Sequence, residues 1–103
     1  MTTRLRTFTT GWALTIGLAL VAGGCAASSA FSKGEAAMKA GDLDQAVAFY
    51  RTASQEEPSN AKYTIALQRG MQASSRAHFA KAQEYEKQQQ LQAARGEYAL
   101  ASE

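Results

Sequence analysis

The sequence predicts an all-α fold of about four helices, with a long third helix, after an N-terminal export signal. Three observations support this prediction. Val47 and Ile65 are the only β-branched aliphatic residues after Cys25, and strands depend on such residues. Alanine and glutamine, which favour helices, dominate the same part of the chain. Pro58 is the only proline, and apolar residues recur at steps of three and four on either side of it.

The first two helices are expected to form a hairpin. One helix runs from about residue 31 to 40, and Gly41 ends it, as glycine often does just past a helix. Asp42 then begins the second helix as its N-cap, and Gln45 three residues later completes a capping box. This helix ends just before Pro58, because the residue that precedes a proline avoids helical geometry.

Two further helices follow the proline. The apolar period predicts one long helix over about 61–88, in which Gly70 marks either a bend or a close contact with another helix. The glutamines at 88–90 form a polar turn. A fourth helix is expected over about 91–102, and four of its residues should face inward: Leu91, Ala94, Tyr98 and Ala101.

Residues 1–24 have the pattern of a secretory signal. Arg4 and Arg6 are their only charged residues, an uncharged apolar stretch follows, and small residues precede Cys25. This ending resembles the lipobox of bacterial lipoproteins, with Ala22 standing where that family usually has leucine. The resemblance implies lipidation of the Cys25 sulfur with diacylglycerol and cleavage of the chain before it.

A lipoprotein signal implies a location in the cell envelope, with a lipid anchor on the periplasmic face. Ala26 after the cysteine, in place of aspartate, favours the outer membrane in bacteria that follow the enteric sorting rule. Two alternatives stay open: an ordinary signal cut near Ala27, and retention of the segment as a membrane anchor. Residues 25–30 are expected to form a tether of small residues.

The charge pattern after the signal argues against one class of partner. The formal net charge is +2, but Arg4 and Arg6 belong to the signal, and the rest of the chain has equal numbers of basic and acidic residues. A nucleic-acid-binding domain needs a clustered basic excess, so no nucleic-acid partner is expected. Cys25 is the only cysteine, so no disulfide can form within the chain.

No residue pattern predicts catalysis, and the chain is expected not to be an enzyme. His78 is the only histidine and has no cysteine or second histidine with which to share a metal, so it is expected to be packed or half-exposed. Two acidic pairs, Glu56–Glu57 and Glu84/Glu86, lie at helix ends near basic residues and are expected to be solvated. The sequence has no phosphate-binding loop or nucleophile motif, and no cofactor, metal or small-molecule substrate is expected.

One spacing of small and large residues occurs twice. The first copy covers residues 31–60 and comprises Gly34, Gly41, Leu43, Ala46, Tyr50, Ala53 and Pro58. The second, incomplete copy covers 75–103, offset by 48 positions, and comprises Ala82, Tyr85, Leu91, Ala94, Tyr98 and Ala101. This spacing resembles the tetratricopeptide (TPR) repeat, a helix-turn-helix unit of about 34 residues. Residues 61–74 extend the third helix, and Ala37 departs from the family, which usually has a large residue there.

In tetratricopeptide repeats the first helix of each pair lines a groove that holds peptides or partner helices. By position, the resemblance assigns two sets of groove residues. The first copy supplies Ser28, Phe31, Glu35, Met38 and Lys39, and the second supplies Arg76, Phe79, Gln83, Glu86 and Lys87. Each set combines an aromatic side chain with charges of both signs, which suits a mixed segment with an aromatic anchor and a polar rim. The alternative is that Phe31 and Phe79 pack against a neighbouring repeat.

The helical region from Phe31 to Glu103 also resembles the N-terminal part of certain secretin-family proteins, the outer-membrane rings of type II secretion and type IV pilus systems. This resemblance implies a scaffold that docks proteins in secretion or pilus assembly. The second copy ends before its closing proline, which favours the front of a longer protein over a small lipoprotein that docks or dimerises through that face. Alternatives are a stand-alone tetratricopeptide lipoprotein (a pilotin or an outer-membrane assembly factor) and an exported hydrolase with a helical front segment.

Overall fold

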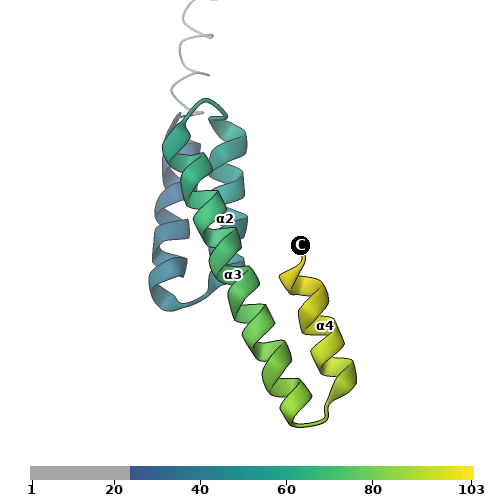
Figure 1. Cartoon of the computed structure of the whole chain (residues 1–103). Helices are drawn as coiled ribbons and strands as arrows, with labels where there is room; N and C mark the ends of the chain where they lie inside the picture. The colour runs from purple at the N-terminus through teal and green to yellow at the C-terminus, as the bar shows by residue number, and fades with distance from the viewer. Residues whose placement is uncertain (1–23) are drawn as a thin grey trace, which may run out of the picture.

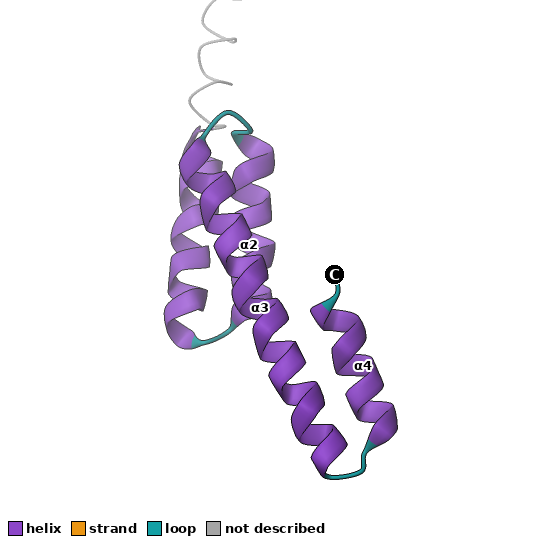
Figure 2. Ribbon diagram, viewed as in Figure 1, coloured by secondary structure: helices purple, strands orange, loops and turns teal. Residues whose placement is uncertain are grey.

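A computed structural model describes residues 24–103, and every regular element in that range is a helix (Figure 2). Residues 24–40, which we call the N-terminal helix, are followed by α2 (Leu43–Glu56), α3 (Ala61–Lys87) and α4 (Leu91–Ala101). The all-α prediction and the long third helix are confirmed. The predicted signal lies outside the described residues, except for its last position.

The helices form two antiparallel hairpins, and α3 of the second hairpin also packs against the first (Figure 1). The N-terminal helix and α2 make the first hairpin, and the first half of α3 packs against both of them. The second half of α3 extends beyond this hairpin and pairs with α4. The C-terminal end of α4 points back toward α2, so that Leu100 and Glu103 line a pocket together with Asp44.

The tether expected at residues 25–30 is helical instead. Ala27 and Ala30 are buried and belong to a core cluster with Ala53 and Tyr63. Alanine has the highest helix propensity of all residues, and its small side chain allows another helix to approach closely. These helical residues extend the first hairpin by about two turns toward Cys25, which is exposed.

Local signals set the other helix ends close to their predicted positions. The Asp42 side chain accepts a hydrogen bond from the Gln45 backbone N–H at 3.4 Å, which confirms its role as N-cap of α2. Asn60 caps α3 in the same way, by accepting from the Lys62 backbone N–H at 3.1 Å. Because α2 ends at Glu56, two residues before Pro58, the connection from α2 to the Asn60 cap is short and brings α3 back along the hairpin.

Both hairpins turn through the same backbone motif. In the first turn Gly41 has a φ of +78°, and the N–H of the next residue donates to the carbonyl of Ala37 at 2.9 Å. In the second turn Gln89 has a φ of +59°, and the N–H of the next residue donates to the carbonyl of Tyr85 at 2.8 Å. A left-handed residue followed by this bond is the Schellman motif. The two turns are related by the same offset as the sequence repeat.

We expect Gln89→Gly to raise the free energy of unfolding by about 0.5 kcal/mol. The left-handed region costs a residue with a Cβ about 1–2 kcal/mol, whereas glycine loses more backbone entropy on folding, by about 0.5–1 kcal/mol. The matched change, Gly41→Gln, should lower the same free energy by a similar amount. Urea unfolding followed by circular dichroism measures both. A loss of stability in Gln89→Gly would contradict the equivalence of the two turns.

The core of the first hairpin consists of small residues around one ring. The completely buried side chains are alanines: Ala27, Ala46 and Ala53. Tyr50, which is 3% exposed, lies between two glycines. A Cβ added at Gly34 would lie 2.6 Å from the Tyr50 ring, and one added at Gly70 would lie 3.2 Å from it. Gly70 therefore marks a close helix contact inside a continuous α3.

The second hairpin is packed less fully. Ala82 and Ala94 are buried, whereas Tyr98 and Ala101 are only half-buried. The prediction that Leu91 faces inward is wrong, because its side chain is 67% exposed. As the first residue of α4 it lies at the turn, where no helix in residues 24–103 covers it.

Candidate functional site

A groove of about 660 Å³ runs between the N-terminal helix and the first half of α3. Its lining residues recur at helical spacing on both helices, so each helix presents one face to it. The Asn60 cap fixes where α3 begins, and the packing of Tyr63 into the first hairpin orients this face of α3 toward the groove. The lining consists of Phe31, Glu35, Met38, Tyr50, Lys62, Ile65, Ala66 and Arg69.

Phe31 is the aromatic centre of this groove. Its ring centroid lies 5.8 Å from that of Tyr50 and 5.1 Å from that of Tyr63. The Lys62 Nζ lies 4.5 Å from the Phe31 ring centroid, within the range of a cation–π interaction. Ile65 beside them is 47% exposed. The groove therefore has apolar surface that a ligand can reach.

The charged side chains of the groove differ in whether they have a polar partner. The Tyr50 hydroxyl donates to Glu35 Oε1 at 2.6 Å. Burial, and then this bond to Glu35, raises the pKa of Tyr50 to about 12. Lys62 and Arg69, by contrast, form no ion pair with any other residue in the range 24–103. Within residues 24–103, the groove thus presents two cations that form no ion pair and one carboxylate that accepts a hydrogen bond from Tyr50.

The residues predicted to line a groove belong to different surfaces. Three of them line the groove described above: Phe31, Glu35 and Met38. Two others line a pocket on the second hairpin: Arg76 and Phe79. The rest are exposed and line neither: Ser28, Lys39, Gln83, Glu86 and Lys87. Glu86 accepts a hydrogen bond from the Tyr98 hydroxyl at 2.9 Å, which places it on the side of α3 that faces α4.

Sequence reasoning missed the contribution of α3 to the groove. That contribution consists of Lys62, Ile65, Ala66 and Arg69. These positions follow the i, i+3, i+4, i+7 pattern of a single helix face. The same pattern predicted the helix, so the signal was available. The resemblance leaves these residues out, because it assigns the groove only to the first helix of each repeat.

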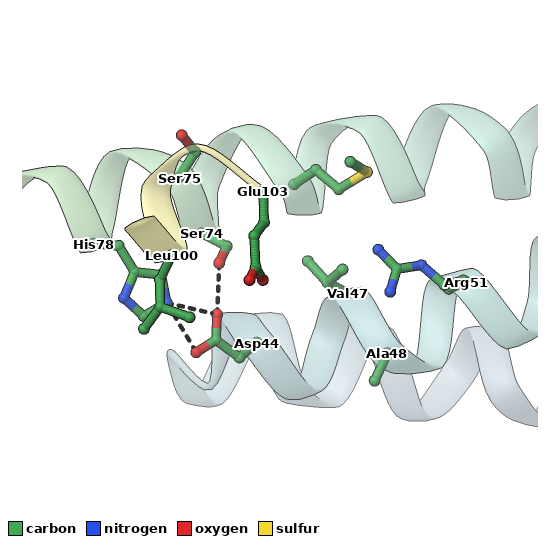
Figure 3. A pocket seen from close by; sticks show the side chains of 10 residues that line it. Asp44, Val47, Ala48, Arg51, Ser74, Ser75, His78, Leu100 and Glu103 are labelled. Atoms are coloured by element: carbon green, nitrogen blue, oxygen red, sulfur yellow. Dashed lines mark hydrogen bonds and ion pairs between the residues drawn. The ribbon is translucent and has the colours of Figure 1, made fainter. Parts of the chain in front are cut away.

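A second pocket, of about 340 Å³, lies between α2, α3 and the end of α4 (Figure 3). The His78 Nε2 lies 2.9 Å from Asp44 Oδ2 on α2, and its Nδ1 lies 2.5 Å from Glu97 Oε2 on α4. The Ser74 hydroxyl donates to Asp44 at 2.5 Å, and Lys81 Nζ lies 3.4 Å from Glu97. One imidazole therefore links three helices.

His78 is half-buried, as the sequence predicted, but its partners lie 34 and 19 residues away along the chain. No local spacing could have revealed them. Within the described residues, no group of three or more histidine, cysteine, aspartate or glutamate side chains has the arrangement of a metal site.

The charges of this cluster stabilise one another. Hydrogen bonds to Glu97 and then to Asp44 raise the pKa of His78. The bond from Ser74, and then the bond with His78, lowers the pKa of Asp44, and the bond with His78 is the main cause of the lowered pKa of Glu97. A protonated imidazole donates from both nitrogens, whereas a neutral one donates from only one. The link between α2 and α4 is therefore complete only when His78 is protonated.

We expect this cluster to make folding stability depend on pH. The pKa of His78 is raised above its unfolded value of 6.5, so its contribution is fully present below pH 6.5 and is lost as the pH rises through the folded-state pKa. The pKa values of Asp44 and Glu97 are lowered, so their contributions are present above the unfolded values of 3.8 and 4.5 and are lost as the pH falls through the folded-state values. Arg51 and Glu103 line the same pocket, and the charge of Lys81 contributes to the lowered pKa values of Asp44 and Glu97.

Urea unfolding at a series of pH values between about 5 and 8 measures this dependence. In His78→Gln the side chain stays neutral, so the loss of stability above pH 6.5 should disappear. Lys81→Gln keeps the bridge and is the matched control, because it should keep the slope. An unchanged slope in His78→Gln would assign the pH dependence to other groups.

A scan against protein-family models, a search of curated proteins and a search of solved structures each found no match to this chain. None of the helices in residues 24–103 combines the length and apolarity that a membrane span requires.

Proposed function

We propose that residues 24–103 form a non-catalytic docking module of the tetratricopeptide type, which binds a segment of a protein partner in the groove between the N-terminal helix and α3. The observation that carries this proposal is the accessible apolar surface around Phe31 and Ile65, flanked by Lys62 and Arg69, which form no ion pair within residues 24–103. Such a groove suits a segment with an apolar or aromatic anchor and at least one carboxylate.

The internal repeat of the structure supports this class of module. The two hairpins have the same turn motif at equivalent positions. The same offset relates two aromatic pairs, whose ring centroids are 5.8 Å apart for Phe31–Tyr50 and 5.5 Å apart for Phe79–Tyr98. A helical solenoid is built from a repeated supersecondary unit in which the same internal contacts recur.

The proposed setting of this module is the periplasmic face of the bacterial outer membrane, with an anchor at Cys25. Cys25 is exposed, so its sulfur is open to modification. The resemblance of residues 31–103 to secretin N-terminal regions favours a role in the assembly of a secretion or pilus machine. Labelling of cells with a radioactive fatty acid tests the anchor: Cys25→Ser should lose the label, and a labelled mutant would contradict lipidation at this residue.

Site-specific photo-cross-linking in cells tests the groove. A photoreactive amino acid at Ile65, which is exposed in the groove, should give a discrete adduct with a protein partner. The double change Lys62→Glu and Arg69→Glu should abolish this adduct, because it reverses the charge that attracts the carboxylate of the partner. Both residues are exposed, so the variant should fold like the parent, and circular dichroism checks this.

The matched control places the same photoreactive group at Gln92, an exposed position on α4 that lies outside the groove lining. The Ile65 adduct should be missing there. The proposal fails if Ile65 gives no adduct, if the charge reversal leaves the adduct unchanged, or if Gln92 gives the same one.

A further inference from the structure

One end of the first hairpin is sealed by α3. Tyr63 of α3 packs over Ala27, Ala30 and Ala53 in a single buried cluster, and its ring centroid lies 5.1 Å from that of Phe31. All three alanines are buried, and Tyr63 itself is only 7% exposed. The first hairpin is therefore covered by one aromatic side chain of α3, which packs against a layer of small residues that we call the floor of the hairpin.

The equivalent surface of the second hairpin is an open pocket of about 420 Å³. Its lining consists of Ser75, Arg76, Phe79, Tyr98, Ala101 and Ser102. Three of these residues stand 48 positions after Ala27, Phe31 and Ala53. Phe79 is 49% exposed, and no residue in the range 24–103 takes the place that Tyr63 has over the first hairpin.

We propose that this pocket docks an amphipathic helix of a partner protein, which presents a tyrosine or phenylalanine to Phe79 as α3 presents Tyr63 to Phe31. The seated α3 shows, within the same molecule, what kind of element fits this floor and which side chain it delivers. The partner helix therefore needs one aromatic anchor on its apolar face.

The chemistry of the pocket suits an apolar anchor. Phe79 packs against Tyr98 with an interplanar angle of 64° and remains half-exposed, so part of its ring is available to a second aromatic side chain. The Ser75 hydroxyl donates to the Ala101 carbonyl at 2.5 Å. This bond satisfies a polar group of the floor that an apolar ligand would otherwise leave unpaired.

The pocket is separate from the groove of the proposed function. The two linings have no residue in common, and they lie on different hairpins. Binding of a helix in this pocket therefore does not depend on what binds beside Phe31.

A fluorescein-labelled peptide of residues 57–74 is the probe, because it carries both Tyr63 and the Asn60 cap of the helix that seals the first hairpin. Fluorescence anisotropy measures its binding to the full chain in mild detergent. We expect saturable binding that weakens at least about tenfold on Phe79→Ala, and equally on Tyr63→Ala in the peptide. Leu91→Ala removes another exposed apolar side chain of the same hairpin and should change the affinity less than about twofold.

Four outcomes would overturn the proposal. The first is no saturable binding up to millimolar peptide. The second is equal binding to the parent and to Phe79→Ala. The third is loss of binding only on the Lys62→Glu and Arg69→Glu double change, which would place the peptide in the groove. The fourth is a dimer of the parent chain in analytical ultracentrifugation that Phe79→Ala dissociates, which would assign the pocket to a second copy. Circular dichroism of Phe79→Ala verifies that this variant is folded.

Discussion

Replacement of Tyr50 by alanine is expected to lower the free energy of unfolding by about 3–5 kcal/mol. Tyr50 and Tyr63 are the only large side chains in the buried core of residues 24–103, and the other core residues are alanines. The ring fills the space between Gly34 and Gly70, neither of which has a side chain that could occupy the cavity. A domain of about 80 residues has a total stability of roughly 4–12 kcal/mol, so this single change removes a large part of it.

The matched control is Tyr98→Ala in the second hairpin. Tyr98 is related to Tyr50 by the repeat but is only half-buried, because no described helix covers it as α3 covers Tyr50. Its loss should cost about half as much or less, in proportion to the smaller apolar area that it buries. Urea unfolding followed by far-ultraviolet circular dichroism measures both variants. Equal losses would contradict the packing of α3 against Tyr50.

The sequence was sufficient for most of the helices because the signals that end a helix act on near neighbours. Gly41, Asp42 and Pro58 mark their boundaries whatever the rest of the chain does. The start of the N-terminal helix had no such signal. Residues 25–30 show no period of large apolar side chains, so the sequence predicts a tether there. Their helix is stabilised by burial of Ala27 and other small residues beneath Tyr63, a contact between distant parts of the chain.

The candidate sites divide in the same way. Phe31, Glu35 and Met38 could be assigned to a groove, because their positions in the repeat already imply a common helix face. The bridge of His78 to Asp44 and Glu97 could not be assigned, because it depends on how α4 folds back along α3 toward α2. The residue spacing predicts which side chains share a helix face, and the length of α3 determines which of these faces pack together.

We expect Gly34→Ala to lower the free energy of unfolding by about 1–3 kcal/mol. A Cβ at this position would lie 2.6 Å from two carbons of the Tyr50 ring. The ring cannot move away freely, because Gly70 of α3 closes its other side, where an added Cβ would lie 3.2 Å from it. Overpacking therefore outweighs the gain of about 0.5–1 kcal/mol that alanine normally brings to a helix interior.

Gly96→Ala is the control, since it is the same chemical change inside α4 with nothing within 4 Å of the added Cβ. It should raise the free energy of unfolding by about 0.5–1 kcal/mol. Opposite signs for the two substitutions would separate packing from helix propensity. A second test uses a Tyr50→Leu background, in which the smaller, flexible side chain should relieve the clash, so that Gly34→Ala loses much of its cost. If Gly34→Ala is stabilising in the parent, or is equally costly in both backgrounds, the contact between Gly34 and Tyr50 does not hold the first hairpin together.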